Sequence, residues 1–364
     1  MADRQRSGDE LRPCAFVEVW HREAVIASVA FHNFKALRST SLRLGPCNLL
    51  IGPNGSGKTS LIQAVLQLRS LAKLSPGTME ETAKPTGGPA VPNPGAGKAE
   101  IIFQFSAPHD KIEARLSCVA EVVCDHLELT PSTPAAWQEV KSELARVRSF
   151  FLDHSAIMQP SLPAAGAELA ANGANLAAVL ADRRTQSPAM FEKLEQEVTR
   201  LFPEFSQVVL APIAGGKIEL GLKLAEHDRI VTADNLSQGT LGLLALLTLA
   251  FDPAPPSIVC IEEIDRGIHP RMLREVRDAL YRLCYPASFG ESRAPVQVIA
   301  TTHSPYLLDL FRDHPEEIVI TQKHGAEARF ERLSDRADLN DLLREGSLGD
   351  MWFSGILGGV PDGE

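Results

Sequence analysis

The chain has 364 residues and 44% hydrophobic content, enough for one large domain or two ordinary ones around a buried core. Its formal net charge of −10 at pH 7 argues against a surface that is basic overall, so any contact with nucleic acid would need a local patch or a partner chain. No apolar run approaches the roughly 20 residues that a transmembrane helix needs, and residues 1–14 lack the apolar core of a signal peptide. We therefore expect a cytoplasmic protein without membrane contact.

The cysteines form no CxxC pair and are scattered along the chain, at Cys14, Cys47, Cys118, Cys124, Cys260 and Cys284. This scatter favours reduced thiols over a disulfide framework or a zinc site. Reduced thiols agree with the expected cytoplasmic location.

The first hundred residues predict strands around a glycine-rich loop. Residues 1–23 are polar and carry no motif, and we interpret them as an N-terminal extension. Residues 24–44 alternate as a half-buried hairpin does, and a short apolar strand, 47–51, follows. After the glycine loop, apolar side chains recur with a helical period in 60–74. Residues 75–98 are rich in Pro and Gly, which predicts a loop or a disordered insertion.

The rest of the chain moves from strands to helices and then alternates between them. Strands are expected at 99–105, 114–129, 149–158, 207–213 and 217–224, and helices within 164–202. In the last third, strands at 257–261, 295–302 and 316–320 alternate with helices at 270–285 and from Ser304. This βαβ order predicts a parallel sheet.

Residues 52–59, GPNGSGKT, fit the pattern G-x-x-x-x-G-K-[ST] between a predicted strand and a predicted helix. The glycines let backbone amides turn towards phosphate groups, and the start of the helix adds positive potential. Lys58 would reach the β and γ oxygens of a nucleotide, and the Thr59 hydroxyl would ligate Mg²⁺. The predicted nucleotide contacts are Asn54, Gly55, Ser56, Gly57, Lys58, Thr59 and Ser60.

Residues 235–247, NLSQGTLGLLALL, place a turn of small residues ahead of an apolar helix. Ser237 and Gly239 would present a hydroxyl and free amides to an anion there. A plain helix N-cap is the alternative, because LSQGT is a weak motif in isolation. Its place after the phosphate loop and ahead of an acidic strand favours anion binding.

Two further segments follow predicted strands. In SIVCIEEID, Glu262 would hold Mg²⁺ and Glu263 would orient or deprotonate an attacking water; a solvated acidic turn is the alternative. In VIATTHSPYLLDLF, His303 would donate to a γ-phosphate; a purely structural histidine is the alternative.

In this order the four motifs resemble the ATP-binding-cassette superfamily, and more closely its RecF-like, chromosome-maintenance (SMC) and OLD-type branch. The resemblance covers most of residues 24–360 and includes NFKALRSTSLRLGPCNLLI, ANGANLAAVL, DRGIHP and LGDMWFSGILGGVP. It implies an α/β phosphate-loop NTPase head without coiled coil or Toprim domain. Such a head has a mostly parallel core sheet flanked by helices, an antiparallel β subdomain and a small helical lobe. The expected lobes are 24–160, which holds the phosphate loop, a helical insert at 161–235, and 236–364.

The resemblance also implies a homodimer, or a higher even-numbered oligomer, whose heads meet head-to-tail around ATP. Ser237 would then act on the γ-phosphate held by the partner chain, and Asp265 and His269 would lie where the chain crosses the interface. A glutamine that senses Mg²⁺ is expected as well. Gln159 is the candidate, and Gln104 is the second choice.

Glu262 stands where this family usually has Asp. Because that carboxylate commonly reaches Mg²⁺ through water, a small shift can absorb one extra methylene. The resemblance therefore predicts a slow ATPase with ATP and Mg²⁺, acting as a sensor or scaffold in DNA repair or anti-phage defence. A separate nuclease-like effector and DNA are its expected partners. Two alternatives stay open: the ATP-binding subunit of a membrane transporter, and an ATP-gated scaffold in which hydrolysis is vestigial.

Overall fold

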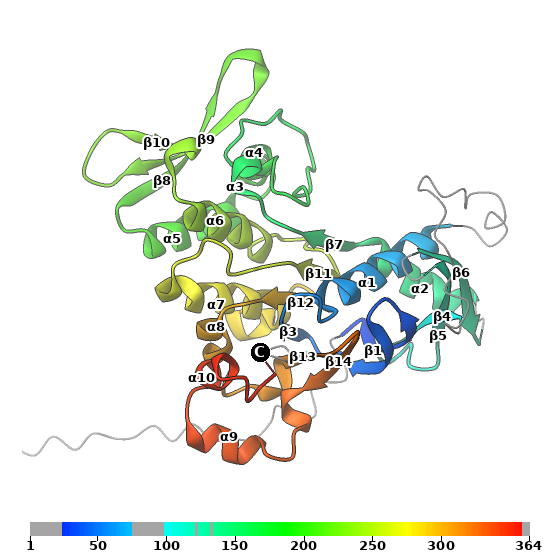
Figure 1. The fold of residues 1–364 in the computed structure, drawn as a ribbon. Coiled ribbons are helices and arrows are strands. Elements are labelled where there is room, and N and C mark those ends of the chain that lie inside the picture. The colour runs from blue at the N-terminus through cyan, green and yellow to red at the C-terminus, as the bar shows by residue number, and fades with distance from the viewer. Residues whose placement is uncertain (1–23, 75–97, 121–122, 132–133, 359–364) are drawn as a thin grey trace, which may run out of the picture.

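The computed structural model describes residues 24–74, 98–120, 123–131 and 134–358 (Figure 1). The predicted extension at 1–23 and nearly all of the predicted loop at 75–98 lie outside the described residues. Among the described helices, none combines the length and the apolar content that crossing a bilayer requires.

A six-stranded sheet runs through the centre of the molecule and is parallel except for one edge strand. Its order is β14 (Glu327–Arg332), β13 (Ile318–His324), β3 (Cys47–Ile51), β12 (Gln297–Thr302), β11 (Ile258–Ile261) and β7 (Val147–Phe150). The mostly parallel core sheet is thereby confirmed. Successive residues of its buried strands face opposite sides, so Leu49 and Leu50 belong to different hydrophobic cores.

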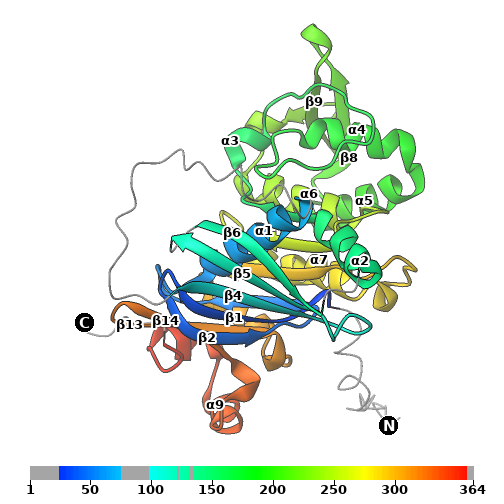
Figure 2. The same cartoon turned by 90° about the vertical axis from the view of Figure 1, so that its right-hand side faces the viewer.

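One face of this sheet is covered by a second, antiparallel sheet and two helices, α1 (Lys58–Lys73) and α2 (Pro134–Ala145). The antiparallel strands are, in order, β2 (Leu37–Arg43), β1 (Ile26–Phe34), β4 (Ala99–Phe105), β5 (Glu113–Ala120) and β6 (Val123–Thr130). Figure 2 shows these five strands side by side in that order, with α1 behind them. This is the expected antiparallel β subdomain.

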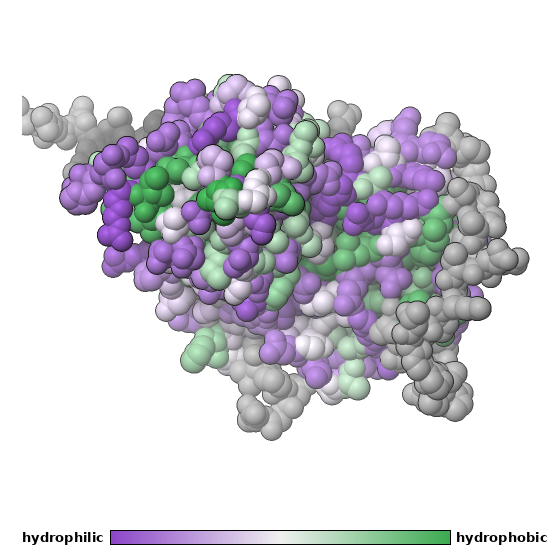
Figure 3. Space-filling view, turned by 90° about the horizontal axis from the view of Figure 1, so that it is seen from above, coloured by the Kyte–Doolittle hydropathy of each residue, from purple (hydrophilic) through white to green (hydrophobic). Residues whose placement is uncertain are grey.

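Helices cover the opposite face and continue into a lobe at the top of Figure 1. The covering helices are α6 (Gln238–Ala250), α7 (Leu273–Cys284), α8 (Pro305–Leu310) and α10 (Leu348–Phe353), with α9 (Leu339–Glu345) beyond them. The lobe holds α3 (His154–Ile157), α4 (Leu176–Gln186), α5 (Pro188–Leu201) and a sheet of β10 (Ile230–Thr232), β9 (Ile218–Leu224) and β8 (Phe205–Pro212). Seen from above, its surface mixes hydrophilic and hydrophobic residues without one continuous apolar face (Figure 3).

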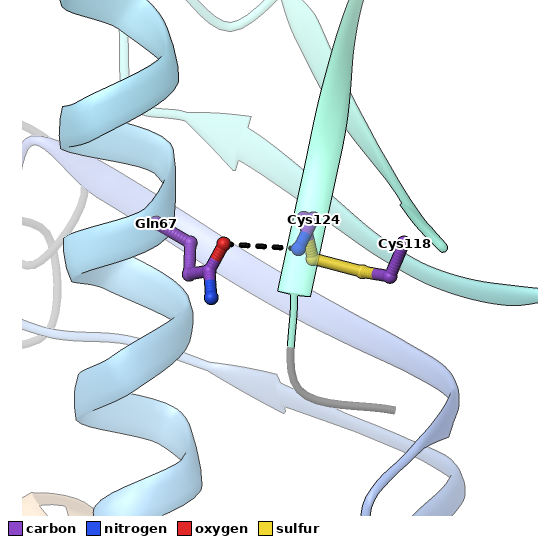
Figure 4. Close-up of a disulfide and its surroundings, with 3 residues drawn as sticks. All are labelled: Gln67, Cys118 and Cys124. Atoms are coloured by element: carbon purple, nitrogen blue, oxygen red, sulfur yellow. Dashed lines mark hydrogen bonds between the residues drawn. A yellow bond between two sulfur atoms is a disulfide. The ribbon is translucent and has the colours of Figure 1, made fainter. Parts of the chain in front are cut away.

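Residues 114–129, predicted as one strand, form the two strands of a hairpin, β5 and β6. The hairpin register sets Cys118 opposite Cys124, and a disulfide joins them (Figure 4). The expectation of reduced thiols was therefore wrong for this pair; Cys47, Cys260 and Cys284 are free and buried. Uninterrupted β-type sequence concealed the turn, and without the turn the two cysteines do not face each other.

The predicted strand at 149–158 was also too long. β7 ends at Phe150, and the carboxylate of Asp153 then accepts a hydrogen bond from the Ala156 amide at the start of α3. This N-cap explains why the chain leaves the sheet before the buried Ile157, whose apolar character suggested a continuing strand.

Candidate active site

The phosphate loop joins β3 to α1 and is shaped by its glycines. Gly55 and Gly57 have φ values of 74° and 95°, in the left-handed region that other residues rarely adopt. A Cβ on Gly52 would lie 1.7 Å from Oγ1 of Thr321, and the Ser56 hydroxyl is hydrogen-bonded to that same hydroxyl. The loop therefore packs directly against β13 and has no room for a side chain at Gly52.

Lys58 folds back over this loop. Its Nζ donates to the carbonyl oxygens of Gly52 at 2.6 Å and Pro53 at 3.0 Å. Burial lowers the pKa of the Lys58 ammonium to about 8, and the nearby Glu263 carboxylate opposes that shift. The structure thus holds a positive charge, protonated at neutral pH, in the hollow of the loop where a triphosphate would lie.

Two of the predicted Mg²⁺ ligands, Thr59 and Glu262, are in direct contact. Thr59 Oγ1 donates to Glu262 Oε2 at 2.7 Å, which joins the first turn of α1 to the end of β11. A hydroxyl and a carboxylate are hard oxygen donors that suit Mg²⁺, which fills its other positions with water and phosphate oxygens. Within the part of the chain that the structure describes, no cluster of three or more His, Cys, Asp or Glu side chains competes as a metal site.

One pocket unites most of the predicted site. Its lining comprises Asn54, Gly55, Ser56, Gly57, Lys58, Thr59, Ser60, Glu262, Glu263, Thr301 and His303. Burial and the Lys58 charge lower the pKa of His303, while Asp265 and Glu263 act in the opposite direction. The imidazole is therefore neutral at physiological pH and has one N–H with which to donate.

The turn at residues 236–240, called here the Ser237 turn, lies outside that pocket in the same chain. Ser237 caps α6 by accepting a hydrogen bond from the Thr240 amide at 3.1 Å, yet its side chain is exposed. Gly239 packs so closely that an added Cβ would lie 2.8 Å from the Gly267 carbonyl oxygen. Ser237 is therefore a helix N-cap, as the alternative interpretation predicted. Its exposed hydroxyl does not line the pocket that contains Lys58 of the same chain.

The segment after Glu263 is tied to the neighbouring strand. Thr302 Oγ1 donates to Asp265 Oδ1 at 2.6 Å. His269 is exposed, and its Nδ1 accepts from the Arg271 amide at 3.2 Å, which begins a short 3₁₀ turn, Pro270–Met272. Neither residue lines the phosphate-loop pocket, so each stays a prediction for an interface between chains.

Neither predicted glutamine lies in the pocket. The exposed Gln159 donates to the Ser155 carbonyl at 3.2 Å, and the exposed Gln104 accepts from the Ser28 hydroxyl at 3.0 Å on the antiparallel sheet. The residue that sequence reasoning missed near this place is His154, which lines a cavity together with Glu262 and Glu263. His154 could have been found from its place shortly after the end of β7 at Phe150. The predicted strand ran on to residue 158 and so hid this position.

Thr301 is the second residue that sequence reasoning missed. It lines the pocket from β12, and its hydroxyl accepts a hydrogen bond from the Glu263 amide at 2.9 Å. The available signal was its place two residues before His303 at the end of a buried strand.

A family model described as "AAA domain, putative AbiEii toxin, Type IV TA system" matches residues 47–309, more than half of the chain. No curated protein matches the chain in sequence.

Solved structures with a similar fold include three SMC heads. One, bound to the C-winged helix domain of ScpA, has a TM-score of 0.54 at 13% identity over 84% of this chain and 97% of that one. The SMC head domain from Thermotoga maritima gives 0.50 at 14% identity, over 85% and 98%. An Smc head with an extended coiled coil, bound to the C-terminal domain of ScpA derived from Pyrococcus furiosus, gives 0.51 at 14%, over 88% and 100%. At this identity the likeness concerns the fold alone.

Proposed function

This chain belongs to the AAA-domain family described as "putative AbiEii toxin, Type IV TA system" and has an SMC-like ATPase head, and we propose that it binds ATP with Mg²⁺ and hydrolyses it slowly. The observation that carries the proposal is the convergence of phosphate loop, acidic pair and histidine on one pocket. Three separate segments of the chain supply these groups, and packing alone would not require that.

Each group has a role that its geometry supports. Lys58 binds the β and γ oxygens, and Glu263 orients and deprotonates the attacking water. Thr59 and Glu262 would hold Mg²⁺, which when bound neutralises charge on the phosphates. Neutral His303 donates a hydrogen bond to the γ-phosphate.

We further propose that two copies meet head-to-tail, with the Ser237 turn of each copy closing the phosphate-loop pocket of the other. Support comes from the exposed Ser237 hydroxyl, which no group of its own phosphate loop contacts. The free amides at the start of α6 are suited to a γ-phosphate. The mass of the complex should therefore differ between the ATP-bound and the ADP-bound protein. A pure scaffold would give a complex of the same mass with either nucleotide.

We propose a role in defence for this ATPase. The description of the family as a putative toxin of a type IV toxin–antitoxin system favours a defence role over DNA repair. A separate effector chain fits this role, since two of the similar SMC heads are described as bound to ScpA. DNA is the second expected partner, and retention that responds to ATP at rising salt would support it.

Turnover with Mg²⁺, compared with the Glu263→Gln variant, tests the enzymatic proposal. Loss of a general base lowers the rate by about 10²–10⁴-fold, while ATP binding should persist because Lys58 and the loop are unchanged. If the wild-type protein, at concentrations that allow dimers, turns over no faster than Glu263→Gln, the chain is not an ATPase and the scaffold alternative takes its place.

A further inference from the structure

Glu263 has an unusual backbone for the residue proposed as general base. Its φ is 50°, in the left-handed region that side-chain-bearing residues rarely adopt. The other described residues of this kind are Asn33, at the end of β1, and Lys35, in the hairpin turn that follows, where such conformations are common. Glu263 instead lies two residues after the end of the buried strand β11, at the edge of the phosphate-loop pocket.

This conformation has a consequence for the acidic pair. In a continuing strand Glu262 and Glu263 would point to opposite faces of the sheet. The turn at Glu263 breaks that alternation, and both residues line the same pocket. The pair can therefore divide its work between Mg²⁺ and water only while the backbone keeps this turn.

Thr301, on the adjacent strand β12, holds the turn at two successive amides. Its hydroxyl accepts from the Glu263 amide at 2.9 Å, and its carbonyl oxygen accepts from the Ile264 amide at 3.0 Å. The Thr301 side chain is itself almost fully buried, with 3% of its surface exposed, so its hydroxyl is fixed in place. Any residue would supply the carbonyl, but only a hydroxyl-bearing side chain of this size supplies the first bond.

We infer that Thr301 is a positioning residue, whose hydroxyl holds Glu263 in the left-handed turn that directs its carboxylate into the phosphate-loop pocket. The inference rests on the proposed ATPase function and adds a residue to it. Thr301 acts through the Glu263 backbone and takes no part in proton transfer.

Thr301→Val tests this role, because valine keeps the shape of threonine and removes the acceptor. We expect kcat for ATP to fall about tenfold, the effect of losing one hydrogen bond that holds the catalytic geometry, with KM changed less than about twofold. Thr301→Ser restores the hydroxyl and should return kcat to near the wild-type value.

Thr248→Val is the matched control. Thr248 is also 3% exposed, and its hydroxyl donates to the Leu244 carbonyl within α6, far along that helix from the site. The same loss of a buried hydroxyl there should leave kcat unchanged. Melting temperatures of the two valine variants show whether folding, rather than positioning, accounts for a difference.

The inference is overturned if Thr301→Val keeps the wild-type kcat, or if Thr301→Ser is as impaired as Thr301→Val. Should Thr301→Val fail to fold, comparison of Thr301→Ser with Thr301→Ala replaces it, with serine expected to be about tenfold faster. Failure of the ATPase proposal looks different, because the wild type would then match Glu263→Gln before any Thr301 variant is measured.

Discussion

The phosphate loop and the Ser237 turn both lie at the start of a helix, but their environments are opposite. Lys58 is buried and bonded to two carbonyls of its own loop, and Thr59 contacts Glu262 across the sheet. Ser237 is exposed, and its hydroxyl is hydrogen-bonded to the Thr240 amide and hydroxyl of its own turn. In the proposed site between two chains, one half would thus be assembled inside a single chain, while the other half would face outward. The difference suggests that nucleotide binding and hydrolysis separate into a step that one chain performs and a step that needs two.

Removing the lysine should produce the largest effect on binding. Lys58→Ala deletes a charged donor that lies in the hollow of the loop, so ATP affinity should fall about 100-fold, or roughly 3 kcal/mol. Titration with a non-hydrolysable ATP analogue at low protein concentration measures this in the single chain. Lys217→Ala removes an exposed lysine outside the site and serves as the control. An affinity within threefold of wild type would remove Lys58 from the phosphate site.

Ser237→Ala should leave that single-chain affinity unchanged and lower turnover by about tenfold, because a charge-assisted hydrogen bond from the partner is lost. Mixing Lys58→Ala with Ser237→Ala tests whether the two residues act together across a dimer. Each variant alone has two defective sites, but a mixed dimer has one intact site, made by Lys58 of one copy and Ser237 of the other. An equal mixture should recover about a quarter of wild-type turnover. If mixing restores nothing, the two residues do not meet across a dimer.

The features that could be predicted from the sequence are those that a local pattern fixes, and the features that were missed depend on contacts between distant segments. The phosphate loop and the acidic strand were predictable, because a local pattern of residues fixes a strand, a glycine turn and a helix in immediate succession. Gln159 was predicted only from its place along the chain relative to the family pattern. Because β7 ends at Phe150, Gln159 lies outside the pocket and bonds to the Ser155 carbonyl instead. Thr301 and the Cys118–Cys124 disulfide depend on pairing between strands, which neighbouring residues in the sequence do not encode.

A smaller loss of ATP affinity should appear as pH rises, and it should depend on Lys58 in the phosphate loop and not on the Ser237 turn. Burial lowers the pKa of Lys58 to about 8, so the ammonium that binds phosphate is largely charged at pH 7 and mostly neutral at pH 8.5. ATP affinity should therefore weaken by about fourfold over that interval, from the change in the protonated fraction. Lys58→Arg keeps its charge throughout and should lose the dependence even if its affinity is lower. Burial and the Lys58 charge lower the pKa of His303, so most of its titration lies below this interval. The same titration of Ser237→Ala should follow the wild-type curve, because its phosphate loop is intact; a flattened curve in that variant would show that the two halves are coupled within one chain.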